Sequence, residues 1–440
     1  MLRIGFILPS SDYLHDPFRG DPHTHLQILT AIDKALADRV DLHLIDLRGI
    51  HRPWAIHHVL ECDVYLQSVY TLDWDEQVSI AKAIRLHYPS AVHVAGGPHV
   101  TEFPEESLKV FDALVIGEGE EVILQVIRDV EGRSLQKIYR QDSPIDVNAY
   151  PCPSRRFLPR SAVARKGLMT LKKRKGLDQL WGTTVLFSRG CPFHCAFCEM
   201  PKTRMGQGIR YRRPDLVTEE IRTLQRDYGI QGVNLLDEIG IPLGREHALA
   251  HLEAIGSTGI VWRGQCRVDG ITPEIARFAR QSGCVALGLG VESAWQPSLD
   301  AIDKKISLEK ARQAIRILKE NDIEVRIYMI LGLPGEPPDI VERSWDFVQE
   351  TCPDLVIASL FTVRPGTAVF NEPQRFGIKS IRTDWSKTRH MHGRYDEEVP
   401  SLTFEYEEVT PWGRSLTGEQ IVKNYMEFQT RLREHHLSTL

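Results

Sequence analysis

Short apolar runs alternate with stretches of helical periodicity along the first third of the chain. The runs that we interpret as strands cover residues 2–8, 42–45, 63–69, 91–95 and 112–116. Amphipathic stretches such as 24–39 and 76–88 lie between them. Alternation of this kind is typical of a parallel, doubly wound sheet with helices on both faces. We therefore predict a Rossmann-like α/β domain over residues 1–140.

The same alternation resumes near residue 181 with six further apolar runs. They cover residues 183–187, 232–236, 260–268, 284–291, 325–331 and 355–363. Helical patterns such as 215–228 and 308–320 lie between these runs. Six βα units are fewer than the eight of a closed barrel. We expect a second α/β domain over residues 181–380.

Two segments fall outside this alternation. Residues 141–180 are predicted to form a linker, because they hold several prolines and the basic run at 172–175. A basic run can bind an anionic partner, or it can be a solvated crossing segment, and the net charge of −5 favours the second interpretation. Residues 381–440 form a C-terminal extension with a helix-like end at 418–435, which we expect to cap the second domain.

Composition and charge limit the expected partners. The 440 residues are 42% hydrophobic and 26% charged, as in an ordinary globular protein. The net charge of −5 gives no general attraction to nucleic acid or to an anionic membrane. No apolar run reaches transmembrane length, and the chain begins with a strand-like run rather than a signal-peptide pattern. We expect the reducing cytoplasm and neither a nucleic-acid nor a membrane partner.

Three cysteines carry the strongest chemical signal. Cys191, Cys195 and Cys198 have a C-x3-C-x2-C spacing on a Gly-bearing loop that follows an apolar run. A four-iron cluster takes four thiolates, so three thiolates leave one iron open to an outside ligand. The alternatives are a zinc site and buried apolar cysteines. Zinc takes four Cys or His ligands in paired halves, and the sequence has no second CxxC pair, although His194 lies within the loop. We favour the iron–sulfur cluster.

The remaining cysteines indicate that there is one cluster. They stand alone in the sequence, at Cys62, Cys152, Cys266, Cys284 and Cys352. Isolated cysteines in such a chain are mostly small buried hydrophobes. A second cluster would need several thiolates close together.

From the three-cysteine loop to about residue 370 the chain resembles the radical S-adenosylmethionine (SAM) enzymes. The resemblance implies a partial (β/α)6 TIM-like barrel with the cluster loop after its first strand. It also implies a [4Fe-4S] cluster whose open iron holds SAM and cleaves it to methionine and a 5′-deoxyadenosyl radical. The electron would come from an external flavodoxin-like or ferredoxin-like donor.

Later strands of the barrel end in segments similar to the SAM-binding motifs of this family. By that similarity the SAM-binding residues are Phe197, Asp237, Glu238, Arg267, Glu292, Ser293 and Gly332. Two simpler interpretations remain open. Asp237 and Glu238 suit the N-terminus of a helix, where acids are favoured by the helix dipole. Phe197 is equally suited to ordinary packing.

Two glycine-bearing strand ends in the first domain resemble those of the B12-dependent radical SAM class. They are Gly96-Gly97-Pro98-His99 and Gly117-Glu118-Gly119-Glu120, which in that class border cobalamin. A glycine at such a corner is also often only a turn. The D-x-H-x-x-G motif that gives cobalt a histidine in other B12 proteins is missing, and none of His15, His23 and His25 has its spacing. The resemblance therefore implies cobalamin without a protein ligand to cobalt.

The predicted activity is that of a radical SAM methyltransferase that uses cobalamin to methylate an unactivated carbon. The substrate would be a small molecule or a peptide. One alternative is radical cyclisation, oxidation or rearrangement without methyl transfer, with or without bound cobalamin. An alternative of another class is a corrinoid-binding protein without catalysis, against which the intact cysteines and Glu292-Ser293 argue.

Overall fold

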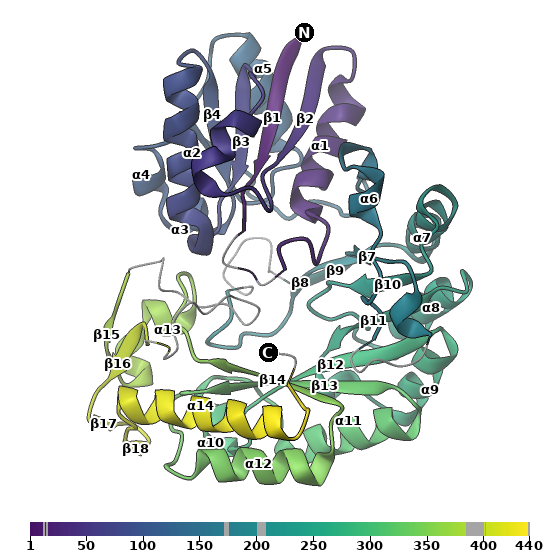
Figure 1. Ribbon diagram of the computed structural model, residues 1–440, viewed down its shortest axis with the longest axis vertical. Coiled ribbons are helices and arrows are strands. Elements are labelled where there is room, and N and C mark those ends of the chain that lie inside the picture. Colours follow the sequence, from purple (N-terminus) through teal and green to yellow (C-terminus); the bar gives the residue numbers. More distant parts are fainter. Residues whose placement is uncertain are drawn as a thin grey trace.

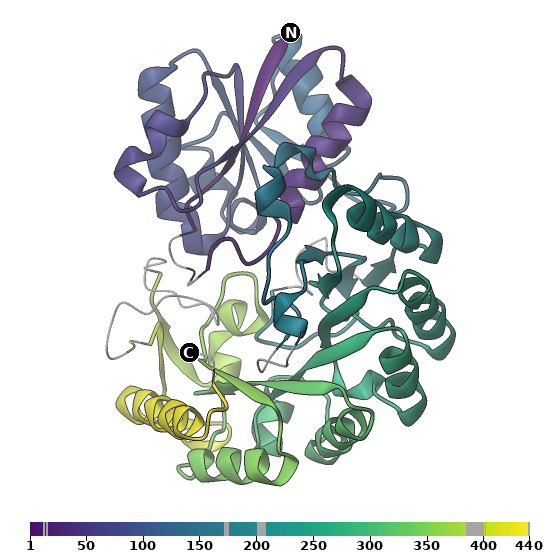
Figure 2. The same cartoon turned by 45° about the vertical axis from the view of Figure 1, so that its right-hand side comes forward.

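The computed structural model describes residues 1–11, 14, 16–170, 176–199, 208–383, 400 and 402–438. His15 and the basic run at 172–175 lie outside these residues. Within them the chain forms two six-stranded sheets, one after the other in sequence. Figures 1 and 2 show the first sheet with its helices placed over one end of the second.

The first sheet is parallel throughout and has the order β2-β1-β3-β4-β5-β6. Its strands are β1 (Leu2–Leu8), β2 (Val40–Asp46), β3 (Val64–Ser68), β4 (Val92–Gly96), β5 (Ala113–Ile116) and β6 (Ile138–Arg140). The chain runs outward from β1 in one direction to β2 and in the other through β3 to β6. Because the order changes direction at β1, the sheet has a topological switch point, where such sheets bind ligands.

Helices cover both faces of this sheet. They are α1 (His23–Leu36), α2 (Trp74–His87), α3 (Pro98–Glu102), α4 (Pro104–Ser107) and α5 (Val122–Glu131). Apolar residues of α1 and α5 pack with Ile4, Phe6 and Val94 on one face. Residues of α2 pack with Ile7 and Tyr65 on the other face. Successive strand residues point to opposite faces, so both faces are apolar and both are covered.

The second sheet is also parallel, with the order β14-β13-β12-β11-β10-β7. Its strands are β7 (Gly182–Val185), β10 (Gly232–Leu235), β11 (Val261–Cys266), β12 (Cys284–Glu292), β13 (Glu324–Leu331) and β14 (Leu355–Leu360). The outer layer is formed by α7 (Pro214–Tyr228), α8 (Arg245–Gly256), α9 (Pro273–Gln281), α10 (Gln296–Ala301), α11 (Leu308–Glu320) and α12 (Ile340–Thr351). No pairing joins β7 to β14 in the described part of the chain. This is a partial barrel, and the predicted fold class is confirmed.

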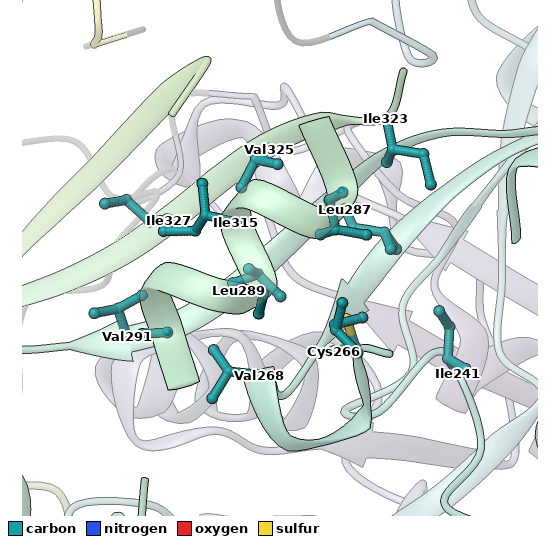
Figure 3. Close-up of a cluster of buried hydrophobic side chains, with 14 of the residues drawn as sticks. Ile241, Cys266, Val268, Leu287, Leu289, Val291, Ile315, Ile323, Val325 and Ile327 are labelled. Atoms are coloured by element: carbon teal, nitrogen blue, oxygen red, sulfur yellow. The ribbon is translucent and has the colours of Figure 1, made fainter. Parts of the chain in front are cut away.

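The barrel core lies between strands and outer helices. Figure 3 shows Leu287, Leu289 and Val291 of β12 beside Ile327 of β13 and Ile315 of α11. These side chains are fully buried. The alternate residues of the same strands point into the barrel, where they are free to form a cavity.

The C-terminal part packs against the last strands of the barrel, β13 and β14. Its elements are α13 (Ala368–Asn371), β15 (Ile378–Ile381), β16 (Phe404–Tyr406), β17 (Val409–Thr410), β18 (Gly413–Arg414) and α14 (Gly418–Glu434). Phe428 and Leu432 of α14 are buried in the barrel core. Gln429 of α14 donates a hydrogen bond to the carbonyl of Ala358 in β14 (2.9 Å). Figure 1 shows α14 lying across β14.

The segment between the two sheets is anchored rather than loose. It contains the short helix α6 (Arg160–Val163) and the buried Arg155. Arg155 forms ion pairs with Asp21 (3.1 Å) and Glu220 of α7 (2.8 Å), and donates to the carbonyl of Thr184 in β7 (3.0 Å). One guanidinium therefore joins the N-terminal domain to the first strand and first helix of the barrel. No helix in the described residues is long and apolar enough to cross a membrane.

Candidate active site

A cavity of 760 Å³ opens at the barrel mouth, and the three motif cysteines all line it. Strand β8 (Ser188–Cys191) ends at the first cysteine and pairs with β9 (Gly208–Tyr211). The loop then turns tightly, with the amide of Cys198 donating to the carbonyl of Cys195 (3.0 Å). The amide of Ala196 donates to the carbonyl of Ile302 (2.8 Å), which fixes the loop to the barrel. Three thiols are thus held around one space, the donor set that a cubane cluster needs.

A buried arginine lies beside this loop. The Nη1 of Arg267 is 3.7 Å from the Sγ of Cys195, and its guanidinium carbon lies 3.7 Å from the ring centroid of Phe193. Asp269 holds the same guanidinium (2.9 Å). Burial raises the pKa of the Cys191 thiol, and the positive charge of Arg267 opposes that rise. A cation in this place favours the thiolate form that binds iron.

The geometry also bears on the zinc alternative. No three His, Cys, Asp or Glu side chains of the described residues are arranged to hold a single metal ion. In a cubane cluster each thiolate binds a different iron, so the thiolates need not converge on one point. His194 is exposed and is not among the residues that line the cavity.

A second cavity, of 310 Å³, lies at the carboxyl ends of the strands of the first sheet. The glycines of both glycine-bearing strand ends line it, together with Pro98, Glu118 and Glu120. His99 does not, because it is fully buried, stacks on Trp74 (4.3 Å between centroids) and lies 3.2 Å from the Oγ1 of Thr71. Burial lowers the pKa of His99 to about 4. The structure thus separates His99 from the other residues of its motif.

Glu118 and Glu120, the two acids of the second glycine-bearing strand end, bind the hairpin that leads into the cluster loop. Glu118 accepts hydrogen bonds from Arg189 (3.1 Å) and Arg210 (2.8 Å), which lie on β8 and β9. Glu120 forms a further ion pair with Arg189. Both carboxylates are buried, so the cavity wall in the N-terminal domain is fixed to the strand that carries Cys191.

The two cavities meet. Tyr70 from the N-terminal domain and Glu238 from the barrel line both of them. The enclosing walls, with Asp237 and Glu199 nearby, raise the pKa of Glu238. A ligand in the first sheet and a ligand beside the cysteines would therefore face one another.

Comparison with known proteins agrees with this arrangement. The family model of the radical SAM superfamily matches residues 185–348. Residues 185–348 are therefore a radical SAM domain. A radical SAM domain implies a [4Fe-4S] cluster and SAM.

Individual relatives are distant. The chain is 28% identical over 310 residues to an anaerobic magnesium-protoporphyrin IX monomethyl ester cyclase of Cereibacter sphaeroides, covering 64% of this chain and 48% of the cyclase. It is 28% identical over 302 residues to an uncharacterized methyltransferase of Pyrococcus horikoshii, covering 66% and 65%. The chain thus spans about half to two thirds of the length of these relatives. The methyltransferase TsrM from Kitasatospora setae, solved with cobalamin and a [4Fe-4S] cluster, superimposes with a TM-score of 0.70 at 17% identity, covering 100% of this chain and 91% of TsrM.

Four of the residues similar to radical SAM motifs line the cavity with the cysteines: Phe197, Glu238, Arg267 and Glu292. Glu292 lies at an irregularity in β12 and has a positive φ of 69°. This conformation turns its carboxylate toward Lys304, with 2.6 Å between Oε1 and Nζ. Gly290 leaves room for the pair, since a Cβ there would lie 2.6 Å from Glu292 Oε1. The pair brings two fixed charges to the place where the polar groups of SAM are expected.

The other three do not line that cavity, because their polar groups are used within the protein. Asp237 accepts hydrogen bonds from the amide of Phe187 (3.0 Å) and the hydroxyl of Ser188, and burial raises its pKa to about 6. It thereby positions the entry to the cluster loop. Ser293 accepts from the amide of Trp295 (3.2 Å). Gly332 lies against α14, where a Cβ would be 2.6 Å from Ile421.

Sequence reasoning missed the charged residues deeper in the barrel. Arg263 and Arg326 both line the 760 Å³ cavity, as does Tyr328. The sequence of β11 did hold a signal. Arg263, Gln265 and Arg267 stand two residues apart along this strand and its end, and all three line the cavity. Residues two apart on a strand share a face, so Arg263 lies on the face that carries Arg267.

Proposed function

We propose that the chain is a cobalamin-dependent radical SAM enzyme that methylates an unactivated carbon of a small molecule or peptide. The observation that supports this most is the meeting of the two cavities at Tyr70 and Glu238. With the cluster in one and a corrinoid in the other, the cluster and SAM supply hydrogen-atom abstraction and the corrinoid supplies methyl transfer. Residues of this chain would keep the substrate between them.

The residues of the barrel mouth fit the cluster and SAM. Cys191, Cys195 and Cys198 would hold three irons. Glu292, Lys304 and Glu238 offer charged groups to the amino and carboxylate ends of SAM, since charge-assisted hydrogen bonds are the strong ones. Phe197 offers an aromatic face at the same wall.

The wall of the N-terminal cavity suits a corrinoid, whose rim carries amide groups. Two buried polar atoms in this wall have no hydrogen-bond partner, the Oε1 of Gln67 and the Nδ1 of His23. Buried polar atoms are normally paired, so these two are suited to a ligand that donates hydrogen bonds. Gly97 and Gly117, with φ of 100° and 94°, expose backbone rather than side chain to the cavity. A Cβ at Gly97 would lie 2.7 Å from the carbonyl oxygen of Val69, so this glycine is required by the turn itself.

Arg189 connects the two halves of the proposed site. Its guanidinium is held by Glu118 and Glu120, while its backbone is two residues from Cys191. Electrostatic interactions across this contact fix the corrinoid wall relative to the cluster loop. An external flavodoxin-like or ferredoxin-like protein is proposed as the electron donor.

A labelling experiment tests the proposal. Protein reconstituted anaerobically with iron, sulfide and hydroxocobalamin would be incubated with SAM that carries a deuterated methyl group, in extracts of the producing cell. Mass spectrometry should find both 5′-deoxyadenosine and a product heavier by the deuterated methyl group. The similarity to a cyclase favours a second candidate, a radical reaction without methyl transfer. That candidate predicts 5′-deoxyadenosine with no labelled methyl group in the product.

A further inference from the structure

Two arginines inside the barrel are buried without a partner. Arg263 on β11 has 6% of its surface exposed and Arg326 on β13 has 8%. Both line the 760 Å³ cavity. The Nε atom of each is buried without a hydrogen-bond partner, and neither side chain forms a hydrogen bond or ion pair with another described residue. Charged groups are seldom buried in this state unless something else pairs with them.

The strand register brings the two arginines to one place. Arg263 pairs with Ala286 of β12, and Arg326 pairs with Gly288 two residues further along the same strand. The two residues therefore lie on either side of β12, with Cα atoms about 12 Å apart, because they are separated by two strand spacings across the sheet and two residues along it. The residues of β12 between them are small. The ring of Tyr328 lies over Gly288, where a Cβ would be 2.8 Å from the ring, and Ala286, Gly288 and Tyr328 all line the cavity together with the two arginines.

The charge balance in this space is positive. Burial, together with the charges of Arg326 and Arg19, lowers the pKa of Arg263 to about 9. Tyr328 and the carboxylate of Glu324 act in the opposite direction. The pKa of Arg19 is likewise lowered by burial and by Arg326. Arg19, Arg263 and Arg326 are thus close enough to affect one another's charge, and Glu324 supplies the one carboxylate among the neighbours that act on Arg263.

The arginine pair lies deeper in the barrel than the cysteines. Arg267, beside Cys195, follows Arg263 by four residues of nearly extended chain. At about 3.3 Å per residue, Arg263 is about 13 Å further along the strand from the cluster loop. Arg267 and the Glu292–Lys304 pair lie nearer to the cluster loop, because Arg267 contacts Cys195 and donates to the carbonyl of Lys304. The deep end of the cavity is therefore separate from the place expected for SAM.

We propose that Arg263 and Arg326 bind an anionic group of the substrate, a carboxylate or a phosphoryl group, at the deep end of the barrel cavity. Guanidinium groups recognise both through paired hydrogen bonds. The substrate would thus be an acid, oriented with its charged end away from the cluster and its reacting carbon toward it. This inference rests on the proposed function only in taking the barrel cavity as the place of the substrate.

The test measures anion binding rather than turnover. Thermal unfolding of the cluster-loaded, full-length chain would be followed with inorganic phosphate and, separately, with acetate, each against chloride at equal ionic strength. One or both anions should stabilise the protein, and the arm that responds distinguishes a phosphoryl group from a carboxylate. Arg263→Met and Arg326→Met should each weaken the apparent affinity by about tenfold. Equal responses in the variants and the unchanged protein, or no response in the unchanged protein, would overturn the proposal.

The unfolding temperature without added anion distinguishes a binding role of Arg263 and Arg326 from a structural one. Arg155 is the matched control, because it is as deeply buried but paired with two carboxylates. Arg155→Met should unfold at a lower temperature, whereas Arg263→Met and Arg326→Met should unfold at the same or a higher temperature. Lower unfolding temperatures for all three would contradict the proposal by giving the pair a structural role.

Equilibrium binding of SAM addresses the remaining alternative. The affinity for SAM should be unchanged in both Met variants. A parallel loss of SAM and anion affinity would assign the pair to the carboxylate of SAM and overturn the proposal. Failure to bind cobalamin or to methylate would overturn the proposed function but would not alter any of these readouts.

Discussion

Glu118 at the end of β5 and Arg189 on β8 join the two domains, with 3.1 Å between Oε1 and Nη1. The acid also accepts a hydrogen bond from the amide of Ile145 (2.8 Å) and binds Arg210. Sequence similarity placed Glu118 at a cofactor, whereas the structure shows that its carboxylate is engaged by the protein. The cofactor wall and the cluster loop are therefore coupled through one buried carboxylate.

Removal of this carboxylate should weaken the contact between the domains. Glu118→Gln leaves Arg189 and Arg210 partly unpaired in a buried place, which costs about 3 kcal/mol. Differential scanning calorimetry should show a lower unfolding temperature or a separation into two transitions. Glu121→Gln is the control, because Glu121 is on the surface and bonded to Gln141. An unchanged thermogram for Glu118→Gln would show that this ion pair does not couple the domains.

The Glu292–Lys304 pair should contribute to the affinity for SAM, whereas the neighbouring Ser293 should not. Glu292→Gln removes the charge that faces the cavity and should weaken SAM binding by about tenfold while iron content stays constant. Ser293→Ala is the matched control, because the Ser293 hydroxyl is buried against Trp295 and does not line the cavity. Isothermal titration calorimetry with SAM separates the two. Equal losses in both variants would restore the motif-based assignment of the whole Glu-Ser pair.

The raised pKa of Glu336 should make the stability of the barrel depend on pH. Burial raises the pKa of Glu336 from 4.5 to about 8, although the amide of Gly332 donates to it (2.7 Å). The folded state then holds a proton that the unfolded state loses, so this contribution is fully present below pH 4.5 and is lost as pH rises to about 8. The stability difference between the native protein and Glu336→Gln should fall with pH, by about 1.4 kcal/mol per unit at most. The measurement is the unfolding temperature of both proteins across this pH range. A constant difference between them would contradict a raised pKa of Glu336.

The cysteine assignment has its own control within the cavity. Cys266 also lines the cavity, but burial raises its pKa to about 12, so it stays a thiol rather than a thiolate. Replacement of Cys191, Cys195 and Cys198 by Ala should abolish the iron chromophore, and Cys266→Ala should leave it intact. Iron analysis and absorption spectra of anaerobically reconstituted protein give both results. Loss of iron in Cys266→Ala would show that a fourth thiolate takes part.

The sequence predicted the fold well because buried parallel strands form continuous apolar runs. It missed β6, which is a three-residue edge strand, and the β8–β9 hairpin, in which Ile209 and Tyr211 are separated by an arginine and the other residues are small or charged. The helix expected at 418–435 is observed as α14, Gly418–Glu434. Short or polar strands give no apolar run, so pairing with a neighbour is what defines them.

The site was predicted less completely, for a different reason. Motif order along the chain located Glu292 and Arg267 near the cysteines, but it also included Asp237 and Gly332, whose contacts lie within the protein. Whether a carboxylate faces a ligand or a backbone amide depends on tertiary contacts that spacing does not encode. Arg263 and Arg326 were missed because a charged residue on a strand is ordinarily assigned to the solvent face.

The central claim is that one chain holds an iron–sulfur cluster and a corrinoid in adjoining cavities. The most direct measurement is the cobalt and iron content of the full-length chain after anaerobic reconstitution with iron, sulfide and hydroxocobalamin, followed by gel filtration. The account predicts one cobalt and about four irons per chain, with the triple cysteine variant losing iron and keeping cobalt. Iron without cobalt in the unchanged protein would contradict the account and leave a radical SAM enzyme that works without cobalamin.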